Sequence, residues 1–160
     1  MKRIIISMAI LVFLGCQGSR YQWFDGTFEE AKLLAGSKLI FLKFYTNTWP
    51  ACIRLDVETL RNPEVQKFSS DNFISIKYNA NEEVGKKYFK QYNCQGVPHL
   101  LFVDIEGNEV DRIIGFLSPT EYLLGIENIA RKQNILQDYL ARYEKGEINA
   151  EIIAAIAMKY

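Results

Sequence analysis

Leu39–Tyr45 (LIFLKFY), followed closely by Trp49-Pro50-Ala51-Cys52, is the stretch of sequence that decides the fold. The first run is almost entirely apolar, which is typical of a central strand covered on both faces. The second run begins a helix, because proline is tolerated in a helix's first turn. A strand that leads into Cys-x-x-Cys at a helix start is the arrangement of a dithiol redox site. Here Cys52 is present, and Trp49 stands where the first cysteine is expected.

The periodicity on either side of this stretch predicts alternating helices and strands. Thr27 and Glu30 form a capping-box pattern at the start of a helix, and Ser118 is the expected cap of another. We expect helices at about 27–36, 50–60, 62–68, 82–92 and 118–133. We expect strands at about 39–45, 73–78, 99–103 and 109–114, and residues 21–24 as a short edge strand or lead-in.

This order predicts an α/β fold with a mixed central sheet and helices on both faces. The alternating first half is followed by a hairpin, whose turn is Glu106-Gly107-Asn108, and then by a last helix. We assign residues 17–133 to this domain. Residues 134–160 form a helical C-terminal extension, read as two helices broken at Gly146. The extension either packs on the domain or begins a longer helical segment.

The overall composition is that of an ordinary globular domain. Among 160 residues, 49% are hydrophobic and 24% are charged, which suffices for a packed core. Lys plus Arg and Asp plus Glu both number 19. This balance argues against a nucleic-acid partner, because phosphate binding requires a basic surface.

The N-terminal segment reads as a secretory signal. Lys2 and Arg3 precede an apolar run, Ile4–Leu14, that is too short to span a bilayer comfortably. Phe13-Leu14-Gly15-Cys16 then resembles a bacterial lipobox. We therefore expect residues 1–16 to be a signal peptide and lipobox, with Cys16 lipidated and the protein anchored to a membrane of the bacterial cell envelope. Plain secretion and an uncleaved anchor are the alternatives.

Three motifs in order resemble the thioredoxin family. Phe44–Asp56 (FYTNTWPACIRLD) is similar to the family's active-site segment, Gly96-Val97-Pro98 to its cis-proline loop, and Asp104–Val110 with Gly115-Phe116 to its last hairpin. The resemblance covers about residues 21–133 and is closest to the exported bacterial branch. It implies the thioredoxin fold, and it implies a cis bond before Pro98 in a surface where an extended peptide pairs.

The site departs from the family pattern. In the gap-free register Trp49 replaces the nucleophilic cysteine; a second register pairs Trp49 with the family's tryptophan and deletes one residue. Both registers leave the attacking thiol missing. In the first register Lys43 takes the position where many members keep a buried acid. Ordinary dithiol turnover is therefore not expected, because exchange needs an attacking and a resolving thiol.

The remaining thiols have several interpretations. Cys52 could be a buried relict that packs as a small hydrophobe, a partner of Cys94, or a monothiol that acts alone in redox chemistry. Cys94, the second candidate thiol, corresponds to an apolar core position of the family. An exported protein meets an oxidising compartment, so a Cys52–Cys94 pair stays open at this point.

The other candidate site residues surround Cys52. Pro50 and Ala51 complete the WPAC loop, and Val97, Pro98 and His99 form the loop that the family folds over it. For Trp49 we favour local packing over an exposed anchor for a partner. His99, the only histidine, either tunes Cys52 or is satisfied within the structure; no Cys/His spacing fits a zinc site.

We therefore predict a cell-envelope thioredoxin-like protein with a degenerate WPAC site. It binds protein or peptide partners and has weak or no thiol–disulfide exchange, without a metal or other cofactor. The alternative is an active oxidoreductase or monothiol redox protein that uses Cys52, with or without Cys94, in redox homeostasis. A third hypothesis is a structural domain whose helical extension docks a larger assembly.

Overall fold

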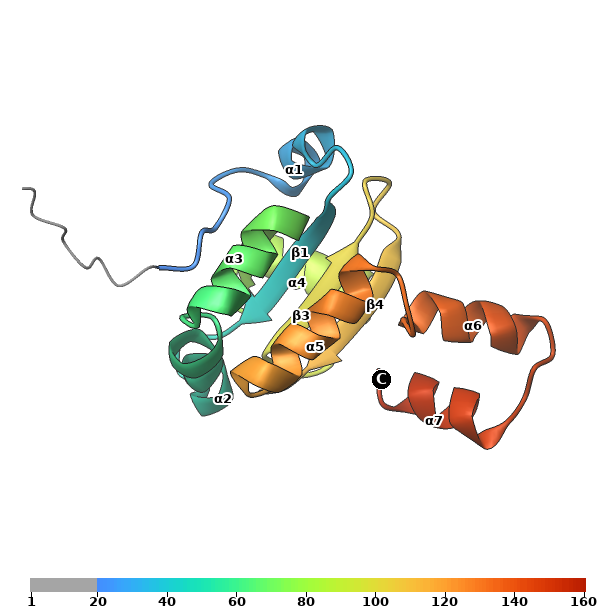
Figure 1. Cartoon of the computed structure of the whole chain (residues 1–160). Coiled ribbons are helices and arrows are strands. Elements are labelled where there is room, and N and C mark those ends of the chain that lie inside the picture. Colours follow the sequence, from blue (N-terminus) through green and yellow to red (C-terminus); the bar gives the residue numbers. More distant parts are fainter. Residues whose placement is uncertain (1–19) are drawn as a thin grey trace, which may run out of the picture.

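The computed structural model describes residues 20–160. The predicted signal peptide and the lipidation site Cys16 lie outside the described residues. The helices, shown in Figure 1, are α1 (Phe28–Leu34), α2 (Pro50–Arg54), α3 (Pro63–Asn72), α4 (Glu83–Gln91), α5 (Pro119–Ala130), α6 (Leu136–Glu144), α7 (Ala150–Ala157) and a π-helix, η1 (Leu55–Thr59). The strands are β1 (Leu39–Tyr45), β2 (Phe73–Asn79), β3 (His99–Val103) and β4 (Glu109–Ile114).

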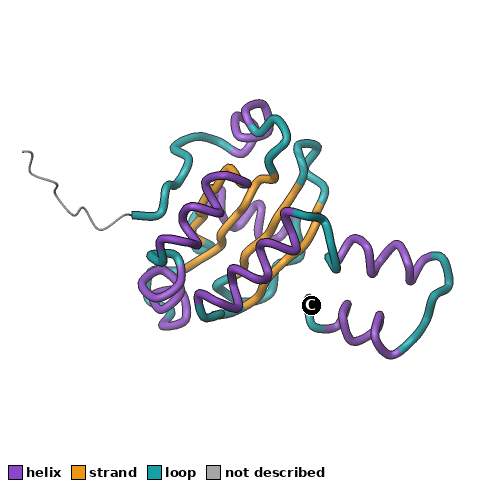
Figure 2. Tube along the Cα trace, viewed as in Figure 1, coloured by secondary structure: helices purple, strands orange, loops and turns teal. Residues whose placement is uncertain are grey.

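The strands form a mixed sheet in the order β2-β1-β3-β4. β1 is parallel to β2 and antiparallel to β3, and β3 is antiparallel to β4. Figure 2 shows the strands between layers of helices. One core joins the sheet to η1, α3 and α5, and the other joins the opposite face to α1 and α4. The predicted α/β fold with helices on both faces is confirmed.

Alternate residues of β1 enter the two cores. Phe41 packs in the core with α3 and α5, while Ile40, Leu42 and Phe44 pack in the core with α1 and α4. Side chains on a strand alternate between faces, so a strand covered on both sides must be apolar throughout. The one charged residue, Lys43, points to the same face as Phe41 and is therefore buried beside the site.

The predicted helix caps are confirmed. Thr27 and Glu30 exchange the two hydrogen bonds of a capping box at α1, and Ser118 and Glu121 do so at α5. Asn62 accepts hydrogen bonds from the backbone N–H groups of the first turn of α3. These caps satisfy backbone donors that have no partner within the helix.

Three boundaries differ from the sequence prediction. Residues 21–24 contain no strand; Phe24 N–H donates one hydrogen bond of 2.8 Å to the Ser75 carbonyl of β2, so the segment is the lead-in. α3 continues to Asn72 rather than ending near residue 68, because Val65 and Ser69 are buried on one face. The helix expected at 50–60 changes from α to π at Leu55.

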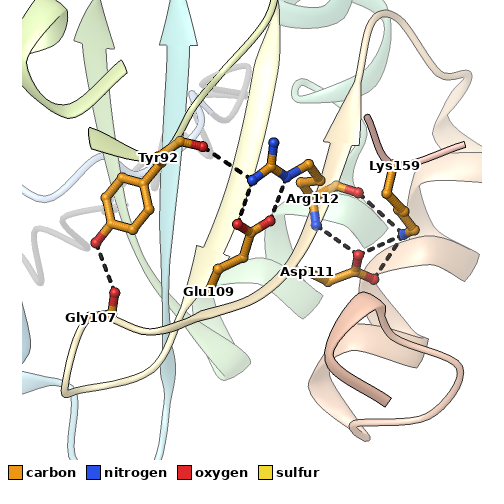
Figure 3. Close-up of polar contacts among 6 residues, drawn as sticks. All are labelled: Tyr92, Gly107, Glu109, Asp111, Arg112 and Lys159. Atoms are coloured by element: carbon orange, nitrogen blue, oxygen red, sulfur yellow. Dashed lines mark hydrogen bonds and ion pairs between the residues drawn. The ribbon is translucent and has the colours of Figure 1, made fainter. Parts of the chain in front are cut away.

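The extension packs against the edge strand β4, which is one of the two arrangements expected for it. Figure 3 shows the contact. Lys159 lies 2.7 Å from the Asp111 carboxylate and donates a 3.2 Å hydrogen bond to the Arg112 carbonyl. Arg112 in turn forms a bidentate ion pair with Glu109 and donates a 3.1 Å hydrogen bond to the Tyr92 carbonyl. The chain's last residues are thus tied to the sheet.

Within residues 20–160, none of the helices combines the length and the apolar character that a membrane crossing requires.

Candidate functional site

The WPAC residues lie where β1 meets α2. Trp49 is the N-cap residue of α2, and its carbonyl accepts hydrogen bonds from the N–H groups of Cys52 (3.0 Å) and Ile53 (3.2 Å). Pro50 and Ala51 form the first turn. Cys52 therefore lies one turn inside the helix, and an indole rather than a thiol stands at the helix start.

Cys52 is a shielded thiol. It is 1% exposed and carries no disulfide. Burial raises its pKa above the ordinary value, although the Thr46 backbone and the Lys43 ammonium favour the thiolate. The thiolate is the reactive form, so these surroundings make Cys52 a poor nucleophile.

Trp49 does not pack locally, contrary to the expectation that we favoured. Its side chain is 54% exposed, and Ile53 (49%) and Val57 (48%) are exposed further along the same helical segment. The N-cap position explains this, because a residue there has extended backbone and its side chain lies outside the helix. We call Trp49, Ile53 and Val57 the apolar stripe.

The Val97-Pro98 loop lies at the same edge of the sheet. Phe44 of β1 is the register partner of His99 of β3, so the end of β1 and the start of β3 coincide. The Val97-Pro98 peptide bond is cis, as predicted. The Pro98 carbonyl accepts a 2.9 Å hydrogen bond from Gly115 N–H. The Val97 backbone makes no hydrogen bond with any residue of the described part of the chain.

Cys94 is a core residue, as the family position implies. It packs among the apolar side chains of the α1 and α4 face, and burial raises its pKa to about 12. Cys52 and Cys94 are both free in the structure, so the pair that we left open is not formed.

His99 is fully buried, and its ring lies 6.3 Å from that of Phe89. Neither ring nitrogen has a hydrogen-bond partner, contrary to the expectation of a satisfied histidine. Burial lowers its pKa to about 4, and the Arg112 guanidinium adds to this. A ring that is neutral at pH 7 does not act on Cys52 as an imidazolium.

Lys43 is a buried cation close to Cys52. It is 1% exposed and pairs with Asp56 of η1. Desolvation lowers the pKa of Lys43, and Asp56 opposes that shift. Sequence reasoning identified Lys43 because, in the gap-free register, it takes the position where many family members keep a buried acid. It missed Asp56, because only the position of η1 brings that carboxylate to the strand.

Among residues 20–160, His, Cys, Asp and Glu side chains form no group of three or more that could hold a metal ion.

Comparison with known proteins places residues 25–130 in a match to the thioredoxin-like domain. The chain is 28% identical over 106 residues to the thiol:disulfide interchange protein DsbD of Yersinia enterocolitica, covering 64% of this chain and 18% of that protein. It is 30% identical over 112 residues to the chloroplastic thioredoxin-like protein HCF164 of Arabidopsis thaliana, covering 68% of this chain and 40% of that one. The chain thus spans less than half the length of these relatives.

A solved structure of a thioredoxin from Thermus thermophilus shares the fold. It superposes with a TM-score of 0.61 at 22% identity, and the match covers 69% of this chain and 88% of that one.

Proposed function

This chain belongs to the thioredoxin-like domain family, and from that premise we propose that it binds extended peptides at its WPAC edge with weak or no thiol–disulfide exchange. Its relatives include proteins named for thiol:disulfide interchange. We thus assign to this chain the peptide-binding surface that the family resemblance implies, but not dithiol exchange.

One observation carries the proposal: the single sulfur of the WPAC loop lies shielded one turn inside α2, and no thiol stands at the helix start. Cys52 is buried with a raised pKa, and Trp49 occupies the exposed position where an attacking thiol would be needed. Exchange requires a thiolate that attacks and a second thiol that resolves the mixed disulfide. Cys94 does not replace the missing group, because its thiol is buried with a pKa near 12.

The binding surface combines a free backbone with exposed apolar side chains. The unpaired backbone of Val97 can accept a strand from a partner, since main-chain hydrogen bonds give affinity in such pairing. At the same edge of the sheet, the apolar stripe offers Trp49, a residue type that is enriched at binding hot spots. The occupant that fits is an extended peptide segment with a large apolar side chain.

We further propose that the protein acts in the bacterial cell envelope, held to a membrane by lipid on Cys16. This part rests on the sequence of residues 1–16. Metabolic labelling with a palmitate analogue tests it: the label should enter the wild-type protein and not Cys16→Ser.

Reduction of insulin by dithiothreitol tests the exchange claim. The wild-type rate should equal that of Cys52→Ser, because no resolving pair exists to turn over. A wild-type rate well above background and lost in Cys52→Ser would instead establish the alternative of an active oxidoreductase.

Peptide binding needs its own test. A panel of extended peptides with and without a central aromatic residue is titrated by calorimetry. Trp49→Ala should weaken binding by about tenfold or more, as truncation of a hot-spot residue does. Leu124→Ala, which truncates an exposed apolar residue of α5, is the matched control and should leave affinity unchanged. Equal affinities in both variants would contradict the proposal.

A further inference from the structure

A concave site lies on the face of the sheet that carries Lys43, beside η1. Its volume is about 210 Å³. It is bounded by residues from the lead-in, β1, β2, η1 and the turn that follows η1: Arg20, Tyr21, Trp23, Lys43, Tyr45, Asp56, Leu60, Arg61 and Lys77. We call it the basic cavity, because four of these side chains are cationic and one is anionic.

Two of its lysines lie side by side. Lys43 and Lys77 are register partners on the parallel strands β1 and β2, so their side chains leave the same face of the sheet. Each ammonium lies near the same two rings: 5.7 Å (Lys43) and 5.7 Å (Lys77) from Trp23, and 5.2 Å and 5.9 Å from Tyr45. Like charges at such positions repel, and the proximity of Lys77 contributes to the lowered pKa of Lys43.

The cavity has fewer anionic than cationic side chains, so its positive charges are not all neutralised. Asp56 pairs with Lys43. Arg20, Arg61 and Lys77 form no ion pair with any residue between 20 and 160. An arrangement that holds cations together without matching carboxylates creates a positive potential, which attracts an anion.

We propose that the basic cavity binds a small soluble oxyanion with at least two negative charges, of the phosphate monoester or pyrophosphate class. The cavity's volume of about 210 Å³ suits a small ion and not a polymer. Arginine forks match phosphate oxygens in pairs, and lysine adds point charge. Both lysine ammonium groups lie within 6 Å of the rings of Trp23 and Tyr45, which hold them at one end of the cavity.

This proposal is independent of peptide binding, because it uses neither the apolar stripe nor Cys52. The two can therefore fail separately.

The test is a titration of the full chain with pyrophosphate at constant ionic strength. Trp49→Phe leaves Trp23, one of the chain's two tryptophans, as the fluorescent reporter inside the cavity. We expect a saturable fluorescence change with pyrophosphate and none with acetate at the same concentration. Absence of a saturable change, or an equal response to acetate, would overturn the proposal.

Substitutions of cavity residues test whether pyrophosphate binds in the basic cavity. Lys77→Gln should weaken pyrophosphate binding by about tenfold, the loss expected for one charged hydrogen bond. Lys77→Glu should abolish it, because the substitution replaces an unpaired cation of the cavity by a carboxylate that repels the anion. Lys86→Gln removes an exposed lysine of α4 and is the matched control. Should the Glu variant fail to fold, Arg61→Gln takes its place, with the same tenfold loss expected.

Unchanged affinity in the cavity variants places the anion elsewhere and overturns the assignment. Vesicles of phosphatidylglycerol in phosphatidylcholine separate a lipid headgroup from a free ion. Capture by those vesicles without any response to pyrophosphate would likewise contradict a soluble ligand.

Discussion

At the scale of the residue, burial determines the protonation state of His99. Its imidazole is enclosed by the α1 and α4 core without a hydrogen-bond partner, and its pKa falls to about 4. Burying an unpaired polar group costs free energy, and burying a charge costs more. The folded protein therefore keeps the ring neutral well below the pH at which a free histidine would take up a proton.

This shift makes stability depend on pH. The pKa of His99 is about 4 in the folded state against 6.5 for the free side chain. Between these values the unfolded state binds more protons, so stability is lost as pH falls from about 6.5 to about 4. The loss attributable to His99 is about 3 kcal/mol.

His99→Leu isolates that contribution. The free energy of unfolding is measured by urea denaturation at pH 7, 5.5 and 4. Removal of the unpaired nitrogens affects the variant's stability equally at every pH. Removal of their protonation should make the variant increasingly stable relative to wild type as pH falls. A difference between the two proteins that stays constant with pH would contradict the account of His99.

At the scale of the element, the caps carry local stability. Ser118 and Glu121 form the capping box that begins α5, the helix that covers the larger core. Ser118→Ala should lower the free energy of unfolding by about 1 kcal/mol, since it leaves an N-terminal backbone donor unpaired. Thr120→Ala alters an exposed residue in the same first turn and is expected to change stability by less than about 0.5 kcal/mol. Equal losses in both would show that the cap contributes little.

Elements and caps were predictable from sequence because their causes are local. A nearly continuous apolar run located β1, and Ser118 followed by Pro119 located the start of α5. The π-helix η1 was not predictable, because the same residues could continue as an α-helix. Its position sets where Asp56 meets Lys43, so the ion pair beneath the site also escaped sequence reasoning.

The exposure of the Trp49 side chain also differs from the sequence prediction. Trp49 was expected to pack locally because exposed indoles are uncommon. The structure places it at an N-cap, outside the helix, where no neighbouring ring meets it among the described residues. Local pattern determines the backbone conformation here, while tertiary arrangement determines what covers the side chain.

At the scale of the whole molecule, the C-terminal extension is joined to the sheet by buried charge. Asp111 is 2% exposed and depends on Lys159 for compensation, while Tyr160 lies 4.6 Å from the Arg112 guanidinium. These contacts link residues about fifty positions apart, which sequence patterns do not reveal. They give the extension a stabilising role in the domain, whatever else it contacts.

Lys159→Met tests this role. Removing one partner of a buried pair leaves an uncompensated charge, so the variant should lose roughly 2 to 3 kcal/mol in thermal or urea unfolding. Lys145→Met, an exposed lysine between α6 and α7, serves as the comparison and should be close to neutral. A Lys159 variant as stable as wild type would mean that the extension is only loosely attached.

The central claim is that this thioredoxin-like domain holds no working dithiol. The most direct measurement is a redox titration of the purified protein in glutathione buffers, with alkylated thiols counted by mass spectrometry. The account predicts no intramolecular two-electron couple in the wild type and the appearance of one in Trp49→Cys, which restores the Cys-x-x-Cys spacing. A reversible couple in the wild-type protein, lost in Cys52→Ser, would contradict it.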